Sequence, residues 1–329
     1  MQKKKRRLPL KIALGIGGTA AVLALTYTAL SLYTPAAVEY KGEKNPNITE
    51  KGKTLVSAHR SGGGIFPENT MTALRGCVES ADFRTDVFEF DLHRTKDGRL
   101  ILLHDDTLDR TTDSTALFGE AGVKPENKTY DELRQLNFGE HFTNDAGKQP
   151  YKGLCGDDIP DELRALALED ALDYLESSGD YGYIIEIKDG GENGFRGVDT
   201  LCEILEERGM LDRVVFGTFQ GEVSDYVDKS HPELMRSAGI KEVLSFYLSA
   251  LVNRDLGNKK LPYVALQIPA NQYGIRLGTE KIINYAHRYN LAVQYWTIND
   301  AEEIRRLSNI GADTIMSDLP DVAYSVIND

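Results

Sequence analysis

Short apolar runs alternate with helical patterns along the chain after residue 53. The extended runs include TLVSAH (54–59), VFEFDL (87–92), YIIEIK (183–188), VVFGTF (214–219), PELMRSAG (232–239), YVALQIP (263–269), LAVQYWTI (291–298) and DTIMSD (313–318). Apolar residues at helical spacing predict helices over 70–81, 166–177, 198–209, 241–253, 279–289 and 300–309. About eight strands, mostly followed by helices, predict a parallel sheet.

Roughly 275 residues with eight such units favour a closed (β/α)8 TIM barrel over residues 54–329. An open doubly wound sheet is the alternative, but the glycine-rich loop after the first strand lacks the GxGxxG pattern. Residues 110–165 break the alternation, and they are too many for an ordinary loop. We interpret them as an insertion after strand two that lies above the barrel mouth and shapes substrate access.

The amino-terminal segment predicts a membrane anchor. No charged residue occurs from Ile12 to Val38, a stretch that as a helix would span roughly 40 Å. Six cations in residues 1–11 place that end in the cytoplasm by the positive-inside rule. We therefore expect a cytoplasmic basic segment (1–11), a single-pass transmembrane helix in the cell membrane (12–38), a polar linker (39–53) and an extracellular barrel. A cleaved signal peptide and a secreted enzyme are the alternative.

Charge and cysteine usage exclude some classes of protein. The formal net charge is −13, and beyond residue 11 the chain carries 32 basic against 51 acidic side chains, a net of −19. So acidic a chain does not bind nucleic acid in general, but it is compatible with metal binding by carboxylates. The three cysteines, Cys77, Cys155 and Cys202, show no CxxC spacing and predict neither a metal site nor a disulfide framework. The oligomeric state stays open.

Polar residues gather where the predicted strands end, which in a barrel is the active-site face. They are His59 and Arg60 after strand one, Glu89 and Asp91 on strand two, His104 shortly after it, Glu186 and Lys188 on strand three, and Trp296 on strand seven. Three converging carboxylates require a cation, and all-oxygen ligands favour Mg²⁺ or Ca²⁺. Two histidines can act as acid and base, and the two cations suit an anionic substrate. This combination indicates phosphoryl chemistry. Trp296 is either a wall of the substrate pocket or a core aromatic.

The loop AHRSGGGIFPENTMTAL (58–74) raises two further expectations. Its three glycines are predicted to let the loop bend around a phosphate and its metal, while His59 and Arg60 stay fixed on the strand. Asn69 or Thr70 is expected to cap the helix that follows.

Several motifs in order resemble the glycerophosphodiester phosphodiesterase family. They are AHR…PENT (58–70), FEFDLHRTKDGRLILLHDDTLDRTT (88–112), IIEIK (184–188), YWTIN (295–299) and GADTIMSDLP (311–320). The resemblance implies a TIM barrel with an insertion after strand two. It also implies a divalent metal held by Glu89, Asp91 and Glu186, with His59 and His104 as the acid/base pair. Arg60 and Lys188 would contact phosphate, and Glu68 would orient Arg60 or a metal-bound water.

In this family a free hydroxyl next to the ester can attack phosphorus to give a cyclic phosphate, which water then opens. We therefore expect a hydrolase that converts glycerophosphodiesters to an alcohol and glycerol 3-phosphate. The alternatives are a lysophospholipase D-like or polyglycerol-phosphate hydrolase and, in another class, a module that only binds phosphate ligands. Two positions depart from the family pattern: Ser61 and Asp313 stand where glycine or another small residue is usual.

Overall fold

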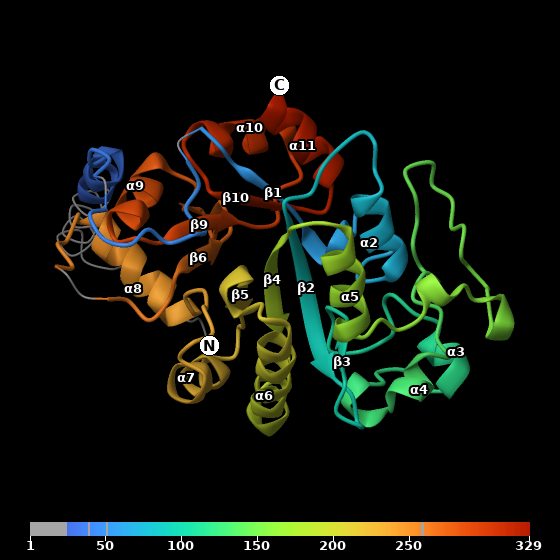
Figure 1. Ribbon diagram of the computed structural model, residues 1–329. Coiled ribbons are helices and arrows are strands. Elements are labelled where there is room, and N and C mark those ends of the chain that lie inside the picture. Colours follow the sequence, from blue (N-terminus) through green and yellow to red (C-terminus); the bar gives the residue numbers. More distant parts are fainter. Residues whose placement is uncertain (1–24, 39, 51, 258–259) are drawn as a thin grey trace, which may run out of the picture.

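Parallel strands form a barrel wall in the computed structural model, which describes residues 25–329 except 39, 51 and 258–259 (Figure 1). The strands are β1 (Leu55–Ala58), β2 (Val87–Arg94), β4 (Gly182–Ile187), β5 (Val214–Gly217), β6 (Ala265–Ile268), β9 (Ala292–Tyr295) and β10 (Thr314–Ser317). They follow the order β5-β4-β2-β1-β10-β9-β6. The eighth position is taken by a short segment at Arg236 and Ser237, which makes parallel bridges to Phe216 of β5 and Ala265 of β6. The predicted α/β barrel is therefore confirmed.

Helices follow the strands and cover the outside of the barrel. The main ones are α2 (Met71–Val78), α5 (Leu168–Ser178), α6 (Gly191–Arg208), α7 (Gly221–Ser230), α8 (Ile240–Leu251), α9 (Glu280–Arg288), α10 (Ala301–Asn309) and α11 (Pro320–Asn328). Side-chain caps fix several starts: the hydroxyl of Thr70 accepts from the backbone N–H of Ala73, so Thr70, not Asn69, caps α2. Helix α2 ends at Val78, earlier than the predicted 81.

Side chains that point into the barrel form an apolar layer next to a polar site. The inward-facing apolar cluster consists of Val87, Ile184, Val215, Ala265, Ala292 and Met316, of which Ile184 and Met316 also border the cavity. On β2 the residues two and four positions after Val87 are Glu89 and Asp91, and on β4 Glu186 follows Ile184 by two. Because side chains alternate across a strand, these acids share the inner face and lie nearer the carboxyl ends.

The insertion has its own small core beside the barrel. Strand β3 (Leu100–Leu102) pairs antiparallel with the end of β2, and the short helices α3 (Ser114–Phe118) and α4 (Tyr130–Leu133) follow. Their apolar side chains pack around Leu108, Leu133 and Phe138. In Figure 1 this region lies at the lower right, apart from α8 and α9 on the left.

Residues 12–24 of the predicted transmembrane helix over 12–38 lie outside the described residues. Residues 25–32 are helical, whereas 33–38 are not, so the described part of that helix ends before Val38. No helix within the described residues is long and apolar enough to cross a membrane.

The segment predicted as a polar linker is partly packed against the amino end of the barrel. The Asn45 side chain is buried and donates to the backbone carbonyls of Val264, at 2.6 Å, and Asn290, at 3.0 Å. The backbone N–H of Thr49 donates to a carboxylate oxygen of the fully buried Asp313, whose other oxygen accepts from the N–H of Val293. These bonds give the unusual aspartate at 313 a structural role: it fastens the incoming chain to the barrel.

Candidate active site

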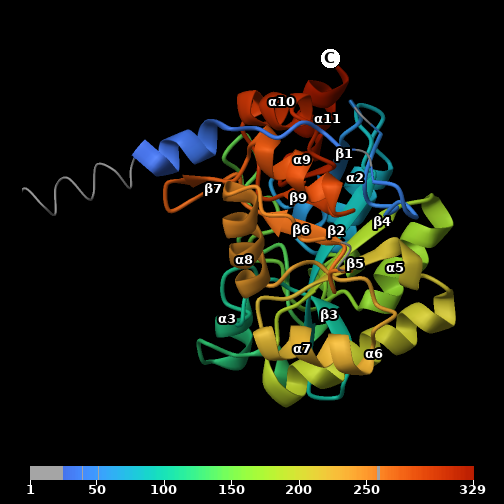
Figure 2. The ribbon, with the colours of Figure 1, turned by 90° about the vertical axis from the view of Figure 1, so that its left-hand side faces the viewer.

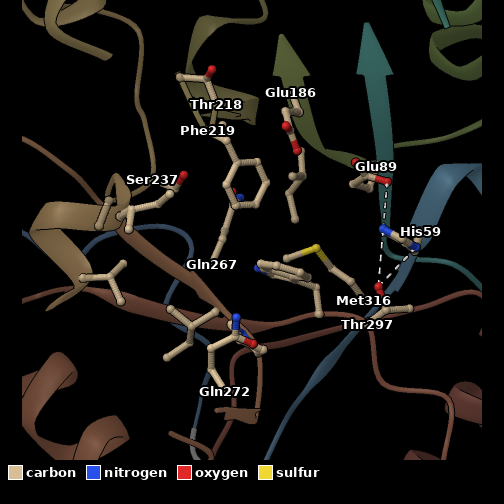
Figure 3. A pocket seen from close by; sticks show the side chains of 18 of the residues that line it. His59, Glu89, Glu186, Thr218, Phe219, Ser237, Gln267, Gln272, Thr297 and Met316 are labelled. Carbon is tan, nitrogen blue, oxygen red and sulfur yellow. Dashed lines mark hydrogen bonds and ion pairs between the residues drawn. The ribbon is translucent and has the colours of Figure 1, made fainter. Parts of the chain in front are cut away.

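A cavity of about 530 Å³ opens at the carboxyl ends of the strands. It is bordered by every predicted site residue except Glu68: His59, Arg60, Glu89, Asp91, His104, Glu186, Lys188 and Trp296. Figure 3 shows Glu89 and Thr297 on either side of the His59 imidazole, with Thr218 and Ser237 across the cavity. No residue of the insertion at 110–165 borders the cavity, so the expected role of this segment in shaping access is not observed.

The three acids are close neighbours on adjacent strands. Asp91 on β2 and Glu186 on β4 are direct cross-strand partners, and Glu89 lies two residues before Asp91. Burial, and then repulsion from Asp91, raises the pKa of Glu89 to about 8. Burial also raises the pKa of Glu186, which Lys188 only partly offsets. The Lys188 ammonium lies 3.0 Å from Glu186 and 3.4 Å from Asp91, so it partly neutralises the cluster.

A divalent cation fits the chemistry of these donors. The acids offer only oxygen ligands, and burial together with repulsion from Asp91 raises the pKa values of Glu89 and Glu186, so a cation at this cluster would stabilise their charged forms. As the side chains stand, no three acidic, histidine or cysteine residues in the described chain are arranged to hold a metal ion. Binding would therefore require the carboxylates to turn toward a shared point and Lys188 to move from between Asp91 and Glu186.

His59 is held in place by a carboxylate that follows the last strand. Its Nδ1 lies 2.6 Å from Asp318, and its Nε2 lies 4.0 Å from Glu89. Burial alone would lower the pKa of His59, but the carboxylates of Glu89 and Asp318 raise it above its ordinary value. Asn299 in turn donates to the second oxygen of Asp318 at 2.7 Å. The imidazole is thus fixed through Nδ1, which leaves Nε2 on the side of the acids.

His104 has the same arrangement with the opposite pKa shift. Its Nδ1 lies 2.7 Å from the Asp105 carboxylate. Burial lowers the pKa of His104, and the nearby carboxylates of Asp91 and Asp105 do not fully compensate, because Lys188 and Arg60 act against them. One histidine therefore favours holding a proton while the other favours accepting one.

Arg110 connects the two loops that carry the histidines. Its guanidinium donates to both oxygens of Glu68, at 2.8 and 2.6 Å, and to both oxygens of Asp105, at 2.6 and 3.0 Å. Glu68 also accepts from Arg60 at 3.3 Å, and Asp105 anchors His104. Arg110 thereby links the residues that support Arg60 and His104.

The glycine-rich loop is packed against protein, contrary to the expectation that it bends around a ligand. A Cβ on Gly62 would lie 2.7 Å from Cys77 of α2, and one on Gly64 would lie 2.8 Å from the carbonyl of Asp318. The N–H of Gly64 donates to that same carbonyl. The glycines thus allow the first loop to approach the end of β10, which brings Asp318 to His59.

Ser61 occupies a strained backbone position, as the departure from the family pattern implies. Its φ is +63°, its side chain is fully buried, and its hydroxyl has no hydrogen-bond partner within the described chain. Ser61→Gly is expected to raise the free energy of unfolding by about 1 kcal/mol, because glycine accepts this φ and removes an unpaired hydroxyl. Urea denaturation measures the gain. Ser61→Ala, which keeps the Cβ, should gain less, and equal or lower stability of the glycine variant would contradict the strain.

An apolar arm extends the cavity away from the charged residues. We define it by its lining side chains: Phe219, Ile240, Val243, Leu244, Tyr247, Ile268, Pro269, Tyr273, Ile275, Leu277 and Trp296. Trp296 makes an edge-to-face contact with Phe219, with ring centroids 5.8 Å apart, so the two rings pack together in the wall of the arm.

Sequence reasoning missed Asp318 and Asn299, which orient His59. Asp318 directly follows β10 and Asn299 lies in the loop after β9, inside the motifs SDLP and WTIN, and a position after a strand at the active-site face is the signal that could have identified them. His93 lies on the same strand as Glu89 and Asp91 but does not border the cavity; it bonds Asp189 at 2.7 Å.

The fold and the cavity define a class: a parallel (β/α)8 barrel enzyme whose site combines carboxylate-anchored histidines with cations and clustered acids. The chain belongs to the glycerophosphoryl diester phosphodiesterase family, whose model matches residues 59–322. It is a phosphodiesterase of that family.

Relatives and solved structures agree over most of the chain. A glycerophosphodiester phosphodiesterase of Caldanaerobacter subterraneus is 27% identical over 276 residues, covering 84% of this chain and 98% of the relative. One of Bacillus altitudinis is 25% identical over 274 residues, covering 83% and 98%. The fold matches that of an Oleispira antarctica phosphodiesterase in complex with the product sn-glycerol-3-phosphate, with a TM-score of 0.63, 22% identity, and coverage of 84% and 97%.

Proposed function

We propose that this enzyme hydrolyses glycerophosphodiesters to an alcohol and glycerol 3-phosphate, using His59 and His104 and a divalent metal. The observation that carries the proposal is the pair of histidines at one cavity, each fixed through Nδ1 by its own carboxylate. Such anchoring holds a ring nitrogen in position for proton transfer. The product bound to the Oleispira antarctica phosphodiesterase supports the choice of substrate.

Arg60 and Lys188 bind the phosphate group in this proposal. The buried Nε of Arg60 has no hydrogen-bond acceptor in the described part of the chain, which suits an incoming anion. Lys188 already lies beside two carboxylates, and its pKa is raised by them despite burial, so it stays charged. A phosphate between these two side chains would be held at the border of the three acids.

The two histidines then move protons at their Nε2 atoms. His104, whose pKa is lowered, accepts the proton of the substrate hydroxyl next to the ester, and that oxygen forms a bond to phosphorus. His59 donates its Nε2 proton to the departing alcohol oxygen as its bond to phosphorus breaks. The cyclic phosphate is opened by water with the two roles reversed, which yields glycerol 3-phosphate and restores both protonation states.

Glu89, Asp91 and Glu186 would hold the metal ion. When bound, Mg²⁺ or Ca²⁺ supplies positive charge that stabilises the phosphoryl oxygens. It would also offset the burial and the repulsion from Asp91 that together raise the pKa of Glu89. Both ions prefer carboxylate oxygens, so the choice between them is left to experiment.

A product screen with and without metal tests the proposal. The full chain is expected to release glycerol 3-phosphate from glycerophosphocholine, to lose this activity in a chelator, and to recover it with Mg²⁺ or Ca²⁺. Glu186→Gln should shift the metal concentration that gives half-maximal activity upward by about tenfold. Hydrolysis that is indifferent to the chelator would remove the metal from the proposal, and the release of a different phosphate product would overturn the bond assignment.

The apolar arm favours a second substrate class, the monoacyl glycerophosphodiesters acted on by a lysophospholipase D. Such lipids keep one free hydroxyl beside the phosphate ester, as the proposed attack requires, and their acyl chain would lie along Val243, Tyr247 and Ile268. The same product screen distinguishes the two substrate classes by the ratio of kcat/KM for lysophosphatidylcholine to kcat/KM for glycerophosphocholine.

A further inference from the structure

Several exposed large apolar side chains of the described chain lie on α8 and on a short hairpin that both border the cavity. Ile240, Leu244 and Leu248 on α8, and Val252 directly after its end, follow one another at four-residue spacing and are 53–64% exposed. Residues four apart on a helix share one face, so they form a continuous stripe. On the hairpin of β7 (Asn271–Gln272) and β8 (Ile275–Arg276), Tyr273 is 96% and Ile275 37% exposed. We call these six side chains the apolar rim.

The apolar rim is continuous with the inside of the cavity. Ile240, Leu244, Tyr273 and Ile275 are exposed to solvent and also line the apolar arm. A surface of this kind on a soluble domain marks an interaction site. A protein partner that covered these residues would also close the opening, whereas a fluid lipid surface would cover them and still supply substrate through it.

The described start of the chain reaches the same surface. The Tyr27 hydroxyl lies 3.1 Å from that of Tyr247, which lines the cavity, and Lys281 of α9 bonds the backbone carbonyls of Leu30 and Leu251. In Figure 2 the helix at 25–32 lies on the left of the molecule together with β7 and α8. Leu25 and Leu32 on this helix are 71% and 78% exposed. The uncharged run that begins at Ile12 therefore enters the domain beside the cavity opening.

Charge around the hairpin is also compatible with a lipid surface. The chain as a whole is strongly acidic, yet residues 260–279, which include the hairpin, contain Lys260 and Arg276 and no aspartate or glutamate. An anionic bilayer would repel most of this protein but would attract this segment.

We propose that the apolar rim docks on a lipid bilayer, with the cavity opening facing the membrane. Tyr273 and the stripe on α8 insert among the lipid head groups, and the apolar arm receives substrate from the bilayer. This proposal goes beyond the hydrolytic function and does not depend on the roles given to the two histidines.

The test measures the depth of labelled positions in the full chain. In a Cys155→Ser background, which removes the exposed thiol, Leu248→Cys carries an environment-sensitive fluorophore. The matched control is Asp180→Cys, because Asp180 is 97% exposed and precedes β4, at the opposite end of the barrel. The vesicles contain phosphatidylcholine and phosphatidylglycerol, with brominated phosphatidylcholine as the quencher.

The label at 248 is expected to shift to the blue and to lose roughly half of its emission to the brominated lipid, because interfacial apolar faces reach the acyl boundary. The label at 180 should change little, even if the amino-terminal segment alone tethers the protein to the same vesicles. Val252→Glu, which lies outside the cavity lining, should reduce quenching at 248 while hydrolysis of soluble glycerophosphocholine is unchanged. Equal responses at 248 and 180, or a lipid-independent blue shift that grows with protein concentration, would overturn the proposal; the latter would assign the rim to a second copy of the chain.

Discussion

Replacement of His59 by alanine is expected to lower kcat/KM for glycerophosphocholine by about a thousandfold, because general acid/base groups contribute factors of this order. In the wild-type protein Asp318 and Asn299 fix the ring, and the carboxylate of Glu89 lies 4.0 Å from its Nε2. Alanine removes the proposed proton donor and leaves these carboxylates without the imidazole that faces them. Steady-state kinetics measure the loss, and circular dichroism checks that the variant folds.

Two further variants show whether this effect belongs to catalysis. His231→Ala removes a histidine that pairs with Asp199 at 2.8 Å outside the cavity, so it should leave kcat/KM near the wild-type value. Asp318→Asn keeps a side chain of the same shape but no negative charge, and we expect a smaller loss than for His59→Ala. A His59→Ala enzyme with near wild-type turnover would exclude His59 as the proton donor.

The barrel could be predicted from sequence because its information is local. Apolar runs such as YIIEIK and LAVQYWTI match β4 and β9, and the alternating helices require a parallel arrangement. The prediction failed where contacts between distant parts of the chain determine the structure. Asn45 and Thr49 read as linker residues, yet their partners Asn290 and Asp313 lie more than two hundred positions away. Polar composition alone could not reveal that they are fastened to the barrel.

The active site could likewise be predicted only where the information is local to one stretch of sequence. Glu89, Asp91 and Glu186 stand within strands, where alternation fixes the face on which they lie. Residues that act through another side chain, such as Asp318 on His59, depend on how close two loops come to each other. The loop glycines illustrate this limit: their sequence suggests a flexible phosphate loop, whereas Gly64 is close-packed against the backbone of Asp318.

Arg110→Ala is expected to lower kcat by about a hundredfold with a smaller change in KM, because a misplaced catalytic group costs a factor of this order. Arg110 makes four charge-assisted hydrogen bonds that hold Glu68 and Asp105 together. Without them Asp105 no longer holds His104 in one orientation, and Glu68 and Asp105 repel each other. Arg110 would thus be a positioning residue, since it does not border the cavity and contacts Arg60 and His104 only through Glu68 and Asp105.

Chemical rescue distinguishes positioning from a general loss of structure. Guanidinium ion added to Arg110→Ala should restore part of kcat, because a free planar cation can bridge the same two carboxylates. Arg110→Lys should have a lower kcat than the alanine enzyme rescued by guanidinium, since an ammonium cannot make paired hydrogen bonds to Glu68 and Asp105 at once. Arg196→Ala, which removes an exposed arginine paired with Glu192 on α6, serves as the control. Its kcat should stay near the wild-type value with and without guanidinium. If guanidinium leaves the alanine variant as slow as before while its thermal stability has fallen, then Arg110 holds the insertion to the barrel and does not set the geometry of His104.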